Sequence, residues 1–115
     1  MMRVIHKKSN TILGENIKHA NNMWSRMIGL MFVSEMKNKD GLLLEPGNSI
    51  HNCFVRFPID VLFISRKNTI VGYIRGFKPW RFSKIYFKSK KVLELPAGKL
   101  PENIEIGDEL EISHV

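Results

Sequence analysis

The stretch Ile59 to Ser65 restricts the fold more than any other part of the chain, because apolar side chains occupy both of its alternating faces. A strand of this kind is covered on both sides and lies in the centre of a sheet. Pro58 precedes it, the residues 66–68 (RKN) supply a turn, and residues 69–75 have the composition of a returning strand. The sequence therefore predicts a hairpin whose first strand is fully buried.

Short strands separated by turn residues dominate the rest of the chain. We expect them at residues 3–6, 11–13, 16–20, 41–45, 49–55, 84–87, 92–95 and 109–113. One helix is expected over residues 22–31, where Trp24, Met27, Ile28 and Met31 recur at helical spacing. This pattern predicts a mainly β fold, either a small antiparallel barrel or a jelly-roll-like sandwich, with one short helix.

The 115 residues are the length of a single domain, and we expect one domain over residues 1–115. A single cysteine excludes an intramolecular disulfide framework and a cysteine-rich zinc module. The N-terminal residues lack the apolar core of a signal peptide, and the longest apolar run is far shorter than a membrane span. We therefore expect a cytoplasmic protein without integral membrane association, and periplasmic export is the alternative.

Charge is distributed in blocks along the chain. The formal net charge is +7, yet residues 61–93 carry nine basic and no acidic side chains, whereas residues 94–115 carry one basic and six acidic ones. The middle block also holds seven of the eleven aromatic residues. Cations interleaved with aromatic rings are typical of surfaces that bind single-stranded nucleic acid. We call residues 75–91 the basic aromatic segment.

Three phrases, in this order, give the chain a family resemblance. They are residues 26–31 (RMIGLM), residues 50–63 (IHNCFVRFPIDVLF) and residues 92–98 (VLELPAG), the last followed by Ile106-Gly107-Asp108. Together they resemble the bacterial and archaeal family DUF192 over about residues 17–112. The resemblance implies a compact, mainly β, jelly-roll-like barrel with a short helix, and it implies no activity.

Polar side chains that interrupt apolar strands supply a first set of functional candidates. A small polar ligand bound at the mouth of the barrel would be held by residues of this kind, with a Trp beside them. The candidates for this binding site are Arg26, His51, Asn52, Arg56, Asp60 and Trp80. A non-catalytic binding module of this type is our first functional hypothesis, and it requires no cofactor.

The basic aromatic segment supplies the second hypothesis, binding of single-stranded nucleic acid or another polyanion. Its cationic candidates are Arg75, Lys78, Arg81, Lys84, Lys88, Lys90 and Lys91. The competing interpretation is structural: Phe82 or Tyr86 closes the barrel, and the lysines keep the surface soluble. In this interpretation residues 94–111 are the acidic counterpart that neutralises part of this block.

Several individual residues have a structural interpretation beside the functional one. Asp60 either pairs with Arg56 across the intervening Pro58 bend or contacts a ligand. Glu94 is either solvated or contacts the basic block.

Gly107 and Asp108 are typical of a tight turn. His51 and Cys53 share one face of a predicted strand, but further ligands at matching spacing are lacking, so no metal site is expected. Hydrolysis by Asp60, His51 or Glu94 is a third, weaker hypothesis.

Overall fold

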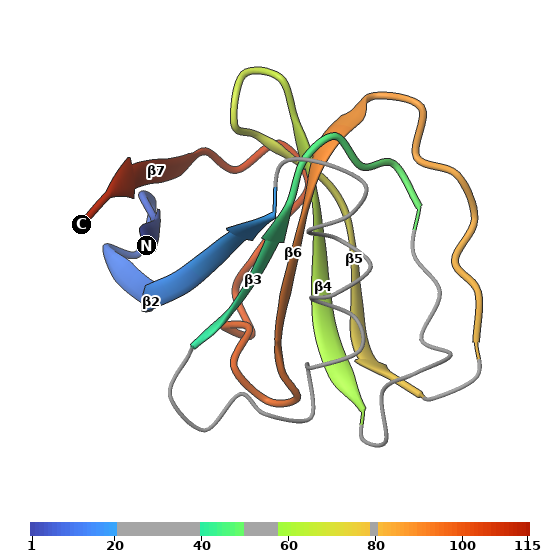
Figure 1. Ribbon diagram of the computed structural model, residues 1–115, viewed down its shortest axis with the longest axis horizontal. Helices are drawn as coiled ribbons and strands as arrows, with labels where there is room; N and C mark the ends of the chain where they lie inside the picture. The colour runs from blue at the N-terminus through green and yellow to red at the C-terminus, as the bar shows by residue number, and fades with distance from the viewer. Residues whose placement is uncertain (21–39, 50–57, 79–80) are drawn as a thin grey trace.

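The computed structural model describes residues 1–20, 40–49, 58–78 and 81–115 (Figure 1). These residues form seven strands, and the prediction of a mainly β fold is confirmed. The strands are β1 (Met2–His6), β2 (Thr11–Ala20), β3 (Gly41–Leu44), β4 (Ile59–Ser65), β5 (Ile70–Phe77), β6 (Ser89–Pro96) and β7 (Leu110–His114).

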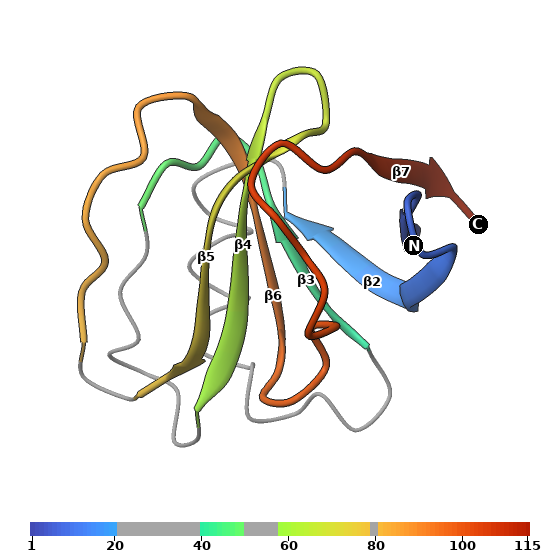
Figure 2. The same cartoon turned by 180° about the vertical axis from the view of Figure 1, so that it is seen from behind.

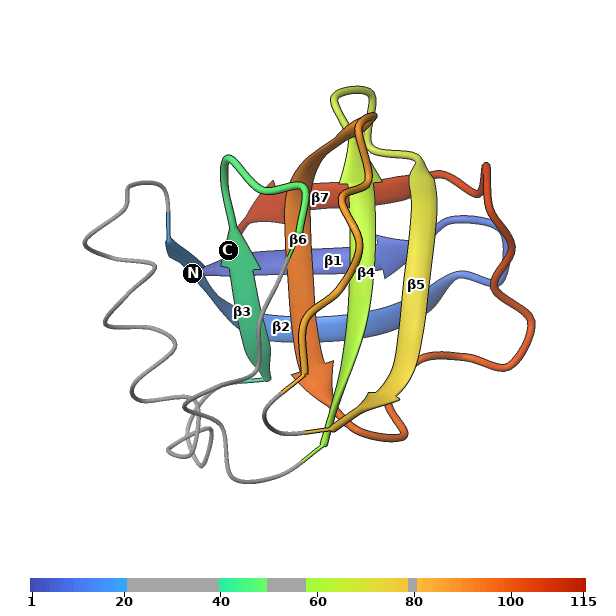
Figure 3. The same ribbon diagram turned by 90° about the vertical axis from the view of Figure 1, so that its right-hand side faces the viewer.

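The seven strands belong to one sheet in the order β5-β4-β6-β3-β2-β1-β7. The sheet curls on itself, so that β1 and β7 run across the strands β3, β6, β4 and β5 in Figure 3. The pairing departs from the antiparallel expectation in one place, because β2 and β3 are parallel. Parallel neighbours require a long crossover connection, and residues 21–40 separate these two strands in sequence.

The two edge strands of the sheet meet at one corner. The start of β7 approaches the start of β5 through an antiparallel bridge between Thr69 and Glu109. The Gly107 N–H donates to the Ile70 carbonyl at 2.7 Å, and the Leu110 N–H donates to the Asn68 carbonyl at 2.8 Å. The curled sheet is therefore a half-barrel that is closed at this corner.

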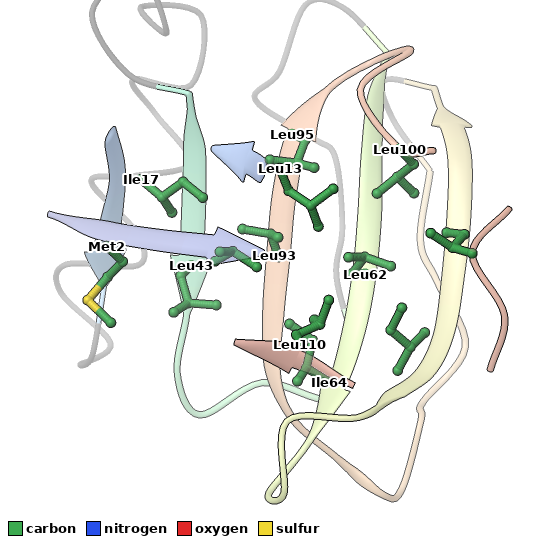
Figure 4. Packing of buried hydrophobic residues seen from close by; sticks show 13 residues of the cluster. Met2, Leu13, Ile17, Leu43, Leu62, Ile64, Leu93, Leu95, Leu100 and Leu110 are labelled. Carbon is green, nitrogen blue, oxygen red and sulfur yellow. The ribbon is translucent and has the colours of Figure 1, made fainter. Parts of the chain in front are cut away.

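A hydrophobic core fills the space between the two halves of the curled sheet (Figure 4). Met2 of β1 and Leu110 of β7 lie on one side of it, and Leu43, Leu62 and Leu93 lie on the other. Every one of these side chains is at most 6% exposed. Removal of this apolar surface from water stabilises the curl of the sheet.

The opposite face of β4 is buried as well. Val61 and Phe63 are fully buried and form a second cluster with Leu42, Leu44 and Val92. The predicted burial of residues 59–65 on both sides is thus confirmed. Leu62 belongs to the core described above, whereas Val61 and Phe63 belong to the second cluster. Strand β4 therefore separates two apolar layers.

Most predicted strand positions agree with the structure, and the remaining predictions either differ from it or lie outside the described residues. Residues 11–13 and 16–20 are one continuous strand, β2, in which Gly14 is buried against Ile17 and Asp40. Residues 84–87 are not a strand, because a turn occurs there and Tyr86 packs against the sheet. The helix predicted over residues 22–31 lies outside the described residues, as does nearly all of the strand predicted over 49–55.

Candidate anion-binding surface

Tyr86 anchors the basic aromatic segment to the sheet. Its ring stacks on Phe63 of β4 with centroids 3.9 Å apart and an interplanar angle of 17°. On β5, Gly72 lies against the same ring so closely that a Cβ atom there would overlap it. The Tyr86 N–H also donates to the Asn48 carbonyl at 2.7 Å. Figure 2 shows the resulting path of residues 81–88, which run along the side of the molecule away from β7.

This anchor forces the neighbouring side chains outward. The Ser89 N–H donates to the Tyr86 carbonyl at 2.8 Å and closes a turn that has Phe87 and Lys88 at its tip. Phe87 is 83% exposed and Phe82 is 75% exposed. Exposed apolar side chains that occur close together on one segment are typical of interaction surfaces.

Cations flank these phenylalanines in the sequence. Lys78, Arg81, Lys84, Lys88 and Lys90 are all exposed, and the Lys84 ammonium lies 5.0 Å from the centre of the Tyr86 ring. The structural interpretation is therefore confirmed for Tyr86, whereas binding of a polyanion by the exposed residues stays a prediction. Tyr86 closes the sheet, while the cations and the two phenylalanines face solvent.

Two of the predicted cations bind the protein itself. The Arg75 guanidinium donates to the carbonyls of Leu100 and Pro101 at 3.0 and 2.6 Å. The Lys91 ammonium donates to Asn68 Oδ1 at 2.6 Å and lies 3.9 Å from a Glu45 carboxylate oxygen. The hydrogen bonds of these two side chains hold parts of the fold together, so fewer of the predicted cations are left without a bond to the protein.

A groove of about 700 Å³ extends the surface beyond the segment. Lys88 lines it from one side, and Arg66 and Lys67 of the β4–β5 turn line it from the other. Arg66 and Lys67 were predicted to form a turn and were not among the candidate residues. The signal that would have included them is their place in the same acid-free stretch, residues 61–93.

Asp60 has a defined structural role. Its side chain is 2% exposed, and its carboxylate accepts three backbone hydrogen bonds. Oδ1 accepts from the Gly76 N–H at 2.9 Å, and Oδ2 accepts from the N–H groups of Gly98 and Leu100 at 2.9 and 3.1 Å. The carboxylate thereby ties the end of β5 and the loop after β6 to β4.

The other five candidates for the small-ligand site lie outside the described residues, so their convergence with Asp60 stays a prediction. They are Arg26, His51, Asn52, Arg56 and Trp80. The proposed Arg56–Asp60 pair and the His51–Cys53 pair stay predictions for the same reason. Glu94, by contrast, is fully buried, so the expectation of a solvated position was wrong.

A second buried polar cluster was missed by sequence reasoning. His6 is fully buried, with Nε2 2.7 Å from Asp108 Oδ2 and Nδ1 2.6 Å from Ser9 Oγ. The hydrogen bond from His6, together with the bond from the Glu105 N–H, lowers the pKa of Asp108 below its ordinary value. The predicted turn at Gly107 and Asp108 is therefore held to β1. His6 and Asp108 are 102 positions apart, so no local sequence pattern could reveal this contact.

The described residues contain no group of three or more His, Cys, Asp or Glu side chains placed to hold a metal ion. Among these residues there is likewise no helix with the length and apolar character needed to cross a membrane.

The curled sheet and its exposed cations define a small, mainly β protein with a basic surface. The model of the family DUF192, described as an uncharacterized ACR, matches residues 4–112, and the chain belongs to this family. The resemblance inferred from the three sequence phrases is thereby confirmed. A UPF0127 family protein of Pyrococcus furiosus is 33% identical over 99 residues, which cover 83% of this chain and 84% of that one.

Two crystal structures have the same fold. A protein of unknown function from Novosphingobium aromaticivorans has a TM-score of 0.77 and 18% identity, and the match covers 96% of this chain and 82% of that one. A protein of Sinorhizobium meliloti, described as a putative transcription regulator, has a TM-score of 0.73 and 26% identity, with 96% and 90% of the two chains covered.

Proposed function

We propose that this protein binds single-stranded nucleic acid through the exposed part of the basic aromatic segment. The observation that carries the proposal is the exposure of Phe82 and Phe87, at 75% and 83%, on a segment that Tyr86 fixes to the sheet. Flat rings held at the surface offer a face to unpaired bases, and neighbouring cations attract the phosphates.

The arrangement favours single strands over duplexes. Bases in a duplex are stacked on each other and leave only their edges in the grooves, where a protruding helix or strand ribbon reads them. The exposed element here is an extended segment that ends in a turn, with separate rings. Such rings suit bases that are free to unstack. The description of the related Sinorhizobium meliloti protein as a "putative transcription regulator" agrees with a nucleic-acid partner.

Binding of a small polar ligand is the second candidate, and it has less support. Asp60 is the one member of its residue set that the structure describes, and both oxygens of its carboxylate already accept backbone hydrogen bonds. A ligand hydroxyl would have to compete with those bonds. A thermal-shift screen with metabolites and glycans tests this candidate, and a ligand-dependent shift that Arg56→Ala abolishes would support it.

Fluorescence anisotropy with a labelled oligothymidylate tests the proposed function. We expect binding at low salt, with an affinity that falls as salt rises by about 0.7 logarithmic units per phosphate contact for each tenfold change in salt. The double variant Lys84→Ala/Lys88→Ala should reduce this slope, because two phosphate contacts are lost. Absence of binding at low salt would overturn the proposal.

Phe87 provides a matched pair of variants. Phe87→Ala should weaken oligonucleotide binding by about 1–3 kcal/mol, the contribution of one base stacked on an aromatic ring. Phe87→Leu keeps an apolar side chain but removes the aromatic face, so it should lose a similar amount. If Phe87→Leu binds as the wild type does, stacking is excluded. Binding to phosphatidylserine vesicles in place of the oligonucleotide would assign the surface to membranes and contradict the proposal.

A further inference from the structure

We infer that the groove beside Lys88 binds the terminal phosphate of the nucleic-acid strand, an inference that rests on the proposed function. The groove joins the turn of Phe87 and Lys88 to the β4–β5 turn and has a volume of about 700 Å³. None of the residues that line it is acidic, and three of them, Arg66, Lys67 and Lys88, are exposed cations.

The walls of the groove are fixed by hydrogen bonds before any ligand arrives. In the β4–β5 turn, the Ser65 N–H donates to the Thr69 carbonyl at 2.8 Å, and the hydroxyls of the same two residues are 2.6 Å apart. On the other wall, the Gly107 N–H donates to the Ile70 carbonyl at 2.7 Å. Little conformational entropy is lost when a ligand binds between walls that are already ordered.

The position of the groove links it to the stacked base. Phe87 and Lys88 are adjacent at the tip of the turn that Tyr86 and Ser89 close. A base that stacks on Phe87 therefore carries its phosphate within reach of Lys88, and that phosphate lies at the entrance of the groove. The guanidinium of Arg66 is suited to the oxygens of a phosphate because it can donate two parallel hydrogen bonds.

The far side of the groove favours a strand end over a continuing strand. Gly107 lies within the acidic block of residues 94–115, and on its two sides the side chains of Glu105 and Glu109 are 71% and 65% exposed. Lys7 and Lys8 face these two carboxylates at 3.2 and 3.6 Å, but residues 94–115 carry six acidic side chains and one basic one. Further phosphates would meet repulsion there. A terminal phosphate carries additional charge and free oxygens. It is attracted to the cations of the groove, and no following phosphate is repelled by the carboxylates.

Anisotropy with three oligothymidylates of equal length tests the inference. One carries a 5′-phosphate, one a 3′-phosphate and one no terminal phosphate, each with its label at the opposite end. We expect one of the phosphorylated strands to bind about tenfold more tightly than the strand without a terminal phosphate, as one additional charge-assisted contact would give. The two phosphorylated strands distinguish the end that the groove accepts.

The double variant Arg66→Ala/Lys67→Ala should abolish this preference, so that all three strands bind alike. Lys18→Ala/Lys99→Ala removes the same amount of charge from positions outside the groove and should leave the preference intact. Equal affinity of the wild type for the three strands would overturn the inference and leave the proposed function standing. A preference that survives Arg66→Ala/Lys67→Ala would overturn the groove as its origin, and failure of every strand to bind would overturn both proposals.

Discussion

Asp60 and the turn at Phe87 form an instructive contrast between two regions of one molecule. Asp60 is an acid among apolar residues, yet its carboxylate is buried and receives three backbone hydrogen bonds. Phe87 is an apolar residue among cations, yet it is 83% exposed on a firmly held turn. The polar residue in an unusual place serves the fold, and the apolar residue in an unusual place is available to a partner.

The difference shows that satisfaction of hydrogen bonds is a better guide to function than the rarity of a residue in its context. A buried carboxylate is costly unless donors surround it, and a chain that supplies three donors has used the group for structure. An exposed ring has no such compensation. The following variants test each side of this contrast.

Asp60→Ala should produce the largest effect. It leaves three buried or half-buried N–H groups without their acceptor and should lower the free energy of unfolding by about 3 kcal/mol or more. Urea denaturation measures this change. In Asp60→Asn one oxygen remains for Gly98 and Leu100, but an amide faces the Gly76 N–H, so we expect a loss of about 1–2 kcal/mol.

At a temperature where both variants are folded, oligonucleotide affinity should stay at the wild-type value. Unchanged stability of Asp60→Ala, accompanied by loss of a small-molecule ligand, would reverse our assignment of this residue.

Gly72→Ala should connect stability to binding. The new Cβ would overlap the Tyr86 ring, and overpacking of this kind costs about 1–3 kcal/mol. Displacement of Tyr86 would also move Phe87, so the affinity for oligothymidylate should fall. Gly98→Ala is the control, because Gly98 has a positive φ of 89° and open space around its Cβ position. It should lower stability through backbone strain and leave oligonucleotide affinity unchanged; a fall in both variants would refute the anchoring role of Tyr86.

The Asp108 contact should give a smaller effect that depends on pH. The pKa of Asp108 is lower in the folded chain than its ordinary value of 3.8, so its ionised form stabilises the fold above that value, and this contribution is lost as pH falls through the folded pKa. Wild type should therefore exceed Asp108→Asn in stability at pH 7, and the difference should shrink below pH 4. Urea midpoints at several pH values measure it. Glu109→Gln, at an exposed pair with Lys7, should show no comparable difference.

Local patterns in the sequence predicted most of the sheet. The strand at residues 59–65 was found with its bounds because a run between Pro58 and a polar turn that is apolar on both faces, apart from Asp60, has few other conformations. The return strand and the final strand were placed within a residue or two for a similar reason. The basic aromatic segment was visible because charge and aromatic content change abruptly at its borders.

Contacts between distant residues were beyond such patterns. The parallel pairing of β2 with β3 depends on the path of a long connection, and the three donors to Asp60 come from residues 16 to 40 positions away. Which cations are hydrogen-bonded to the protein itself was equally hidden, since Arg75 and Lys88 look alike in sequence. The structure distinguishes the two residues, because the carbonyls of Leu100 and Pro101 accept hydrogen bonds from Arg75 and not from Lys88.

The closed corner between β5 and β7 also bears on how copies of this chain behave in concentrated solution. Open sheet edges invite strand addition from a second copy and lead to aggregation. Here the bridge from Thr69 to Glu109 uses backbone groups of both edges, and Arg75 keeps the chain at residues 100–101 against β5. The chain thereby shields part of its own sheet edge. Charged side chains are therefore not needed to protect that part of the edge from strand addition.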